Sequence, residues 1–242
     1  MHVYERSPYA GALVFAAFSG SHQDAIAKGM KYREEKELDR WTVPYIPIDP
    51  KDISRTYDAD VIRVNSQSGK GGIGYLLEQA YGYILPPQMR EDFSYLCKGI
   101  SDHKHAELKA PEVLEIFKEH YFLHNSTITI DDMHFTRKGD SVETEIVFVK
   151  NGEKTALSAS GNGSLDAVSN AVKKYTGITY KLQSYTEHSL SENGSGSVAA
   201  AYIGIENSNG KMYWGAGTNT DIIRASADAL LSAINNMNEE KE

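Results

Sequence analysis

The second half of the chain alternates apolar and polar residues, which is the pattern of half-buried β-strands. Three strands are expected first, over 127–135, 142–150 and 154–160. The Asn151-Gly152 pair between the last two is a strong signal for a tight hairpin turn. Apolar residues at helical spacing follow at Leu165, Val168, Val172 and Tyr175. This order of elements predicts one βββα unit.

A second βββα unit is predicted directly after the first. Its strands are expected over 178–189, 198–206 and 211–215, and its helix over 219–236. The middle strand carries small side chains on both faces, because Ala199, Ala200 and Ala201 are consecutive and successive side chains in a strand point to opposite faces. These small residues leave room for a packed helix or for a small apolar ligand, and the sequence leaves both readings open.

The first half has a different pattern. All seven prolines lie before residue 112, and proline is excluded from paired central strands. Helices are expected over 19–40, 73–81, 91–98 and 112–122, with a loop over 101–109. The sequence therefore predicts the α+β class, in which small helical subdomains precede the two βββα units.

Each predicted unit contains a Gly-x-Gly pair where its third strand gives way to its helix. The pairs are Gly161 and Gly163 in the first unit, and Gly215 and Gly217 in the second. Glycine permits positive φ and lets a second backbone or a small ligand approach closely. The alternative is that both are ordinary strand-to-helix turns that bind nothing.

The residues after each glycine pair predict a helix start. Ser164 and Thr218 could accept hydrogen bonds from amides of the first turn. Asp166 and Asp221 are expected in the same two first turns, and Asp221 stands three residues after Thr218, as in an acidic capping box. Exposed amides and the positive end of a helix dipole would favour a carboxylate or another anion.

The charge balance narrows the function classes. The chain of 242 residues has 25 Lys and Arg against 33 Asp and Glu, a net charge of −8, which argues against a general binder of nucleic acid or of anionic membranes. The single cysteine, Cys97, excludes an intramolecular disulfide and fits a reducing cytoplasm. The sequence shows no apolar run long enough to predict a membrane span. Its abrupt opening suggests a chain cut from a longer protein.

Three further patterns carry less weight. The stretch Ser66-Gln-Ser-Gly-Lys-Gly-Gly72 precedes a predicted helix and invites phosphate binding, but it lacks P-loop spacing. His103 and His105 are spaced like metal ligands, yet they fall in the predicted loop and have no evident third ligand. Glu187 and His188 are adjacent on a strand and point to opposite faces. A structural role is therefore expected for Glu187 and His188, and a solvated loop for His103 and His105.

Four segments, taken in order, closely resemble the C-terminal part of long-form 2-isopropylmalate synthases. They are Leu13-Val-Phe-Ala-Ala-Phe-Ser-Gly-Ser-His-Gln-Asp-Ala-Ile26, Val43-Pro-Tyr-Ile-Pro-Ile-Asp-Pro-Lys-Asp52, Arg63-Val-Asn-Ser-Gln-Ser-Gly-Lys-Gly-Gly72 and Gly161-Asn-Gly163. The resemblance covers nearly the whole chain. The ordered series is far more specific than any one of its members.

The resemblance implies a longer enzyme in which catalysis and regulation are carried by different domains. In that family an N-terminal (β/α)8 barrel binds a divalent metal, zinc or magnesium, and condenses acetyl-CoA with 2-oxoisovalerate. A barrel needs roughly 250 residues, so this chain resembles the remainder alone. The implied parts are linker subdomain I at 1–65, helical linker subdomain II at 66–124, and a leucine-binding regulatory domain at 125–242. No metal ligand is assigned here, and the chain alone is expected to be inactive.

Two linker residues match positions that the family sends into the active site of the partner subunit of a homodimer. They are His22, in Ser-Gly-Ser-His-Gln-Asp, and Tyr57, in Arg-Thr-Tyr-Asp. An imidazole with a pKa near neutrality and a phenol could orient water or take part in proton transfer. The alternative roles are a locally bonded helix-start residue for His22 and a packing residue for Tyr57.

The resemblance also implies a leucine site at the two helix entrances and on the strands between them. The residues that match are Gly161, Asn162, Gly163, Leu165, Asp166, Leu182, Tyr185, Ser189, Ser197, Ala199, Ala201, Asn219, Thr220 and Ile222. This sequence departs from the family pattern at four positions that bear on the identity and affinity of the effector. Ser164 and Thr220 stand where many relatives have proline, and Ser189 and Ser197 stand where alanine is frequent. Two rivals stay open, namely the regulatory part of citramalate synthase, which senses isoleucine, and a stand-alone amino-acid-sensing module.

Overall fold

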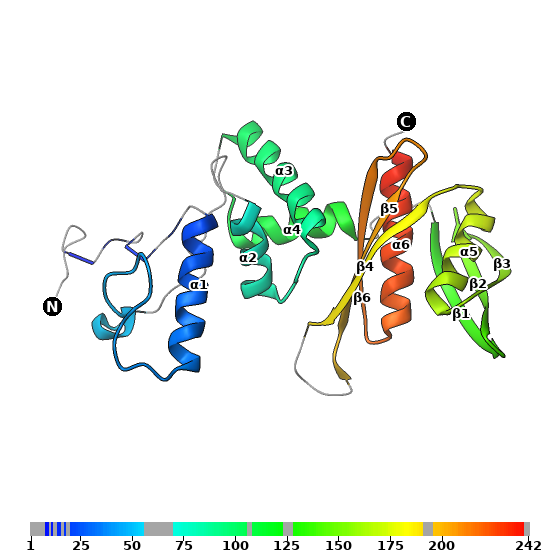
Figure 1. The fold of residues 1–242 in the computed structure, drawn as a ribbon. Coiled ribbons are helices and arrows are strands. Elements are labelled where there is room, and N and C mark those ends of the chain that lie inside the picture. The colour runs from blue at the N-terminus through cyan, green and yellow to red at the C-terminus, as the bar shows by residue number, and fades with distance from the viewer. Residues whose placement is uncertain are drawn as a thin grey trace. The chain divides into compact units, whose positions relative to one another are not determined.

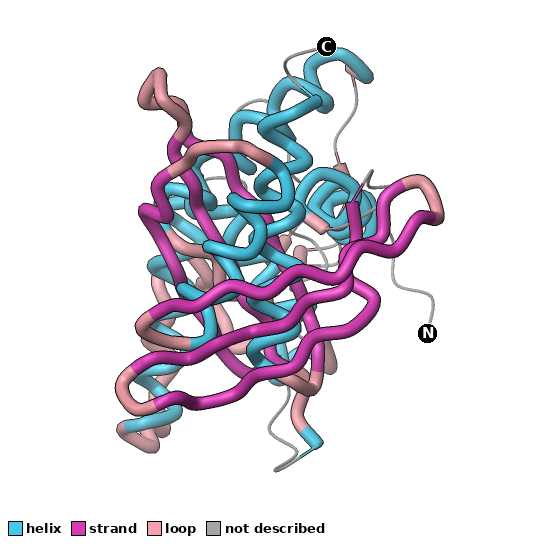
Figure 2. Tube along the Cα trace, turned by 90° about the vertical axis from the view of Figure 1, so that its right-hand side faces the viewer, coloured by secondary structure: helices cyan, strands magenta, loops and turns pink. Residues whose placement is uncertain are grey.

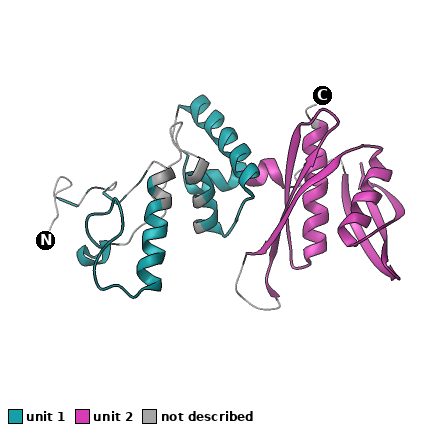
Figure 3. Cartoon of the chain, in the orientation of Figure 1, with its two compact units in different colours: residues 1–116 teal, residues 117–242 magenta. Residues whose placement is uncertain are grey.

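The computed structural model describes residues 20–55, 70–105, 108–122, 128–190 and 196–239, together with residues 8, 9, 11, 14, 15 and 17. The chain forms two compact units, residues 1–116 and 117–242 (Figure 3). Helices come first along the chain, and two three-stranded antiparallel sheets with their helices follow (Figure 1). This order confirms the α+β class.

The first unit is helical in its described part. Its elements are α1 (Gly20–Glu35), the 3-10 helix η1 (Pro50–Ile53), α2 (Lys70–Tyr81), α3 (Pro87–Lys104) and α4 (Ala110–Tyr121), the last of which continues into the second unit. One apolar cluster of this unit joins Ile26 of α1 to Phe15, Val43 and Ile46. The extended stretch before η1 is thus held against α1 by burial of apolar side chains.

The loop predicted over 101–109 is wrong in its first half, because α3 continues to Lys104. The buried residues of α3 recur at helical spacing, and Cys97 and Ser101 extend the stripe begun by Met89 and Phe93. The helix ends where His105 adopts a left-handed conformation with φ of 50°. Ser101 continues the buried face of α3 although it is polar, so the apolar pattern in the sequence did not extend to it.

The second unit contains the two predicted βββα repeats. The first is β1 (Ile128–Lys138), β2 (Ser141–Lys150), β3 (Glu153–Gly161) and α5 (Ser164–Thr176); the second is β4 (Lys181–Ser189), β5 (Ala199–Glu206), β6 (Met212–Asn219) and α6 (Ile222–Glu239). Each sheet keeps its strands in sequence order, and Figure 2 shows the strands running alongside one another. Asn151 and Gly152 both have positive φ, which confirms the hairpin turn between β2 and β3.

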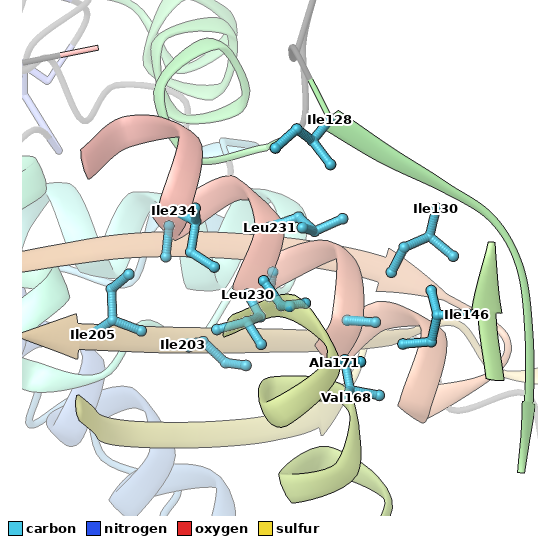
Figure 4. Close-up of a cluster of buried hydrophobic side chains, with 14 of the residues drawn as sticks. Ile128, Ile130, Ile146, Val168, Ala171, Ile203, Ile205, Leu230, Leu231 and Ile234 are labelled. Carbon is cyan, nitrogen blue, oxygen red and sulfur yellow. The ribbon is translucent and has the colours of Figure 1, made fainter. Parts of the chain in front are cut away.

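The core of the second unit lies on both sides of α6. From Ala225 to Asn235 every residue of α6 except Asp228 is buried. Figure 4 shows its Leu230 and Leu231 between Ile203 of β5 and the first sheet, represented by Ile130 and Ile146. A single cluster of buried side chains therefore joins the two repeats.

The glycines of the second pair, Gly215 and Gly217, lie within β6 and not at its end. A Cβ atom on Gly215 would stand 2.1 Å from the carbonyl oxygen of Ala229, and one on Gly217 would stand 2.2 Å from that of Ala225. The turn predicted here is wrong, and so is the strand end predicted at Gly215. These glycines instead let α6 lie directly on β6, which is the close approach expected of glycine.

Candidate functional site

The entrance of α6 is closed by side chains of the chain itself. The Oδ1 atom of Asp221 accepts hydrogen bonds from the amides of Ile223, at 2.8 Å, and Arg224, at 3.4 Å. The Oδ1 atom of Asn219 accepts from the amide of Asp221 at 3.0 Å. The predicted capping role of Thr218 and the helix start at 219 are therefore wrong. The strand runs four residues further than predicted, so Asp221 becomes the capping residue.

The entrance of α5 is built differently. Gly163 occupies the capping position with φ of −158°, and no side chain caps the helix there, so the capping role predicted for Ser164 is wrong. The Oδ2 atom of Asp166 instead reaches back to the amide of Asn162 at 2.8 Å. A Cβ atom at Gly161 would lie 2.4 Å from the amide nitrogen of Ala167, whereas one at Gly163 would meet nothing within 4 Å. A methyl group could therefore be accommodated at Gly163 but not at Gly161.

Three residues predicted for the effector site form one cross-strand row. Ser189 of β4 pairs with Ala199 of β5, and Ala199 pairs with Asn219 of β6. The hydroxyl groups of Ser189 and Ser197 are hydrogen-bonded to each other. The row lies at the end of the sheet where α6 begins, so strand register brings these three residues to the α6 entrance, and the hydroxyl contact adds Ser197.

Tyr185 links the edge strand β4 to α6. Its phenolic oxygen lies 3.0 Å from Oγ of Ser226, and its hydroxyl also donates to the carboxylate of Glu187. The single proton of the Ser226 hydroxyl can be donated either to the phenolic oxygen or to the carbonyl oxygen of Ile222, which lies 2.7 Å from Oγ. Burial raises the pKa of Tyr185, and Glu187 adds to the rise, whereas the hydrogen bond with Ser226 lowers it. The phenol therefore stays protonated near neutral pH and acts as a hydrogen-bond donor.

The remaining predicted effector residues differ in their accessibility. Ala201 is fully buried in the core cluster, and Leu165 and Leu182 pack against that cluster. Leu182 pairs with Ile205 of β5, far along the sheet from the α6 entrance. Thr220 is exposed and donates to Oδ1 of Asn219 at 3.4 Å. The structure thus gathers Ser189, Ala199 and Asn219 at the α6 entrance, while Asp166 and Asn162 are hydrogen-bonded to each other at the α5 entrance.

Two residues at this site escaped the sequence analysis. Ser226 was not predicted, although it follows Ile222 by one helical turn and must share its face. Glu187 was assigned a structural role, although it lies two residues after Tyr185 and so on the same face of β4. Both were detectable from periodicity once the strand and the helix were placed.

The predicted catalytic residues lie in the first unit. His22 is exposed in α1, and its ring stacks on that of Tyr45 with 4.0 Å between the centroids and 27° between the planes. Tyr57 lies outside the described residues. The catalytic assignment of the pair stays a prediction.

Neither a metal centre nor a membrane span is found in the described part of the chain. No three His, Cys, Asp or Glu residues within it are grouped so that they could hold a metal ion. None of its helices combines the length and the apolar character needed to cross a membrane.

Comparisons with known proteins identify relatives over nearly the whole chain. Residues 107–238 match the family described as the LeuA allosteric (dimerisation) domain, and residues 12–78 match the one described as alpha-isopropylmalate synthase, post-catalytic domain-like. Proteins named 2-isopropylmalate synthase from Helicobacter hepaticus and Desulfitobacterium hafniense are each 50% identical, over 97% and 98% of this chain. One from Agrobacterium fabrum is 44% identical over 100% of it. The chain spans only 42–43% of the length of these relatives.

Proposed function

This chain belongs to the family of LeuA allosteric (dimerisation) domains, and we propose that it is the regulatory portion of a 2-isopropylmalate synthase that binds leucine as a feedback inhibitor. The observation that carries the proposal is the row Ser189, Ala199 and Asn219, which meets the start of α6 beside the Tyr185–Ser226 contact. Residues matched to an effector site on sequence alone converge there.

The chemistry available at the two entrances suits a free amino acid. A carboxylate would be stabilised by the first-turn amides of α5 after Gly163, because they lie at the positive end of the helix dipole. An ammonium group finds acceptors in the carboxylate of Glu187 and the side-chain oxygen of Asn219. An isobutyl group needs an apolar wall, and the half-buried side chains of Ala199 and Ile222 offer one.

The proposed site is completed in a homodimer. In the proposed dimer, one leucine contacts the α5 entrance of one copy and the α6 entrance of the other. The family is described as a dimerisation domain. In the proposed arrangement leucine binds between the two βββα units and their symmetry mates, and favours one arrangement of the dimer.

The proposal extends to the longer protein. Its activity is the condensation of acetyl-CoA with 2-oxoisovalerate, the first committed step of leucine biosynthesis, in a cytoplasmic (β/α)8 barrel that holds a divalent metal. Linker segments at 1–65 and 66–124 present His22 and Tyr57 to that barrel, and the regulatory domain at 125–242 controls how they are presented. The purified chain alone is expected to show no thiol release from acetyl-CoA with 2-oxoisovalerate.

Calorimetric titration of the 242-residue chain with leucine, isoleucine and alanine tests the effector. Saturable binding of leucine, weaker binding of isoleucine and none of alanine is expected. The variant Asn219→Ala should weaken leucine binding because an acceptor at the α6 entrance is lost, whereas Asn209→Ala, in the turn before β6, should not. Preference for isoleucine would favour the rival hypothesis of a citramalate synthase, and no heat with any of the three amino acids would overturn the sensing role.

A further inference from the structure

The first two turns of α6 make contacts on two opposite faces of the helix. One face carries Ile222 and Ser226, and it meets Tyr185 of β4 at the proposed effector site. The other face carries Arg224 and Asp228, one helical turn apart. Any shift of the α6 entrance must therefore be accommodated on both faces at once.

Arg224 connects α6 to the first repeat. Its Nη2 atom donates to the carbonyl oxygen of Ile130 in β1 at 2.6 Å, across 94 residues of sequence. Its Nε atom donates to both carboxylate oxygens of Asp228, at 3.1 and 3.3 Å. Ile130 stands beside the irregularity in the β1–β2 register, where ladder pairing is locally disrupted. The guanidinium thus ties the α6 entrance to a defined point on the other sheet.

An ordinary ion pair between residues four apart on a helix is the alternative explanation, and on an exposed helix it contributes little. Three features separate Arg224 from that case. Its side chain is 28% exposed and that of Asp228 is 21% exposed. Arg224 also donates a third hydrogen bond outside its helix, to the carbonyl oxygen of Ile130 in β1. Burial raises the pKa of the Asp228 carboxyl, and the charge and hydrogen bond of Arg224 oppose that rise, so the pair depends on mutual contact.

The pair borders an open cleft of about 400 Å³ and is not embedded in the core. The cleft is lined by Lys118, Phe122, Thr129, Ala216, Gly217, Thr218, Arg224 and Asp228. Water can therefore solvate Asp228 when Arg224 is replaced, and Lys118 supplies a second cation in the same cleft. A variant at Arg224 is expected to fold, because no buried charge is left sealed from solvent.

We propose that Arg224 is a positioning residue for the effector site: it holds the entrance of α6 against β1 in the arrangement that binds the amino acid. The inference rests on the proposed function. Asp221, Ile222 and Ser226 all belong to the segment that Arg224 anchors. Loss of the anchor lets this segment move away from β1, so effector binding must first restore its position, and the affinity falls.

The test compares three variants of the full 242-residue chain. Arg224→Met removes the charge and keeps the aliphatic stem, Arg224→Lys keeps one charged donor, and Glu143→Gln removes a different ion pair, with Lys138, at the tip of the β1–β2 hairpin. Hydrogen exchange of residues 221–229 is measured without ligand, and the leucine dissociation constant is measured by calorimetry. Melting temperatures show whether each variant is folded.

In Arg224→Met, the amide hydrogens of residues 221–229 are expected to exchange faster. Leucine should bind about tenfold more weakly, because one charge-assisted hydrogen bond is lost. Arg224→Lys should recover part of the affinity, and Glu143→Gln should match the unmodified chain in both measurements. A lower melting temperature for Arg224→Met with unchanged exchange and affinity would overturn the inference and leave Arg224 a structural residue. Absence of leucine binding by the unmodified chain would instead overturn the proposed function, and with it this role for Arg224.

Discussion

The hydroxyl groups of Tyr185 and Ser226 lie 3.0 Å apart, and they join the edge strand β4 to the first turns of α6. Strand and helix are 41 residues apart in sequence at this contact. Tyr185 stands on the same strand as Ser189, four residues earlier, and Ser226 follows Ile222 by one helical turn. A ligand at the proposed effector site therefore acts on both elements at once.

Replacing Tyr185 by phenylalanine removes this contact and leaves the ring in place. The loss of a hydrogen bond of this kind costs about 1 kcal/mol, so the melting temperature should fall and leucine binding should weaken several-fold. Tyr32→Phe is the matched control, because Tyr32 is 56% exposed on α1. Equal behaviour of the two variants would show that the Tyr185 hydroxyl contributes nothing to the site.

A methyl group at Gly217 is expected to separate α6 from β6. Its Cβ would lie 2.2 Å from the carbonyl oxygen of Ala225, and backbone must move to admit it. Gly217→Ala should destabilise the second unit by about 1–3 kcal/mol or more. Gly163→Ala is the control, because its Cβ meets nothing within 4 Å and its φ is extended. The free energy of unfolding of both variants is measured by chemical denaturation followed by circular dichroism. Equal stability of the two variants would contradict the close packing of α6 on β6.

The two helix entrances should respond differently to removal of a polar side chain. Asp221→Ala removes the acceptor of two first-turn amides of α6 and should cost about 1 kcal/mol. Ser164→Ala, at the start of α5, should cost much less, since Ser164 makes no capping bond. Thermal melts of the two variants provide the comparison, and a larger loss for Ser164→Ala would refute the assigned caps.

Cys97 should be protected from alkylation as long as α3 is folded. Burial raises the pKa of its thiol from 9.0 to about 12, and the thiolate is the reactive form. Because the folded-state pKa is the higher one, this group stabilises the fold fully below pH 9, and its contribution is lost as the pH rises toward 12. Labelling with iodoacetamide at pH 8 should be slow in buffer and fast in denaturant. Rapid labelling in buffer would contradict the burial.

The order of elements in the second unit was predictable from the sequence because turn residues separate the strand segments and each repeat ends in an amphipathic helix. The length of β6 was not. Gly215 and Gly217 have the composition of a turn, and only the position of α6 shows that they serve close packing within a strand. The cap at Asp221 was misplaced for the same reason. A turn and a packing site for a helix have the same signature in a single sequence.

The candidate site was predictable where it follows strand register and not where it depends on tertiary contact. Ser189, Ala199 and Asn219 converge through pairing alone. Arg224 could not be assigned from sequence, because its partner Ile130 is 94 residues away and contributes only a backbone carbonyl. Every residue has a backbone carbonyl group, so the identity of a residue does not indicate that its carbonyl accepts such a hydrogen bond. The boundaries of the linker segments and the roles of His22 and Tyr57 stay predictions.

A crystal structure of the chain grown with leucine tests the central claim most directly. Leucine is expected between the entrances of α5 and α6 of paired copies, with its carboxylate at the amides after Gly163 and its ammonium group near Glu187 and Asn219. Leucine bound elsewhere, or an empty crevice together with an unchanged melting temperature in saturating leucine, would contradict the account.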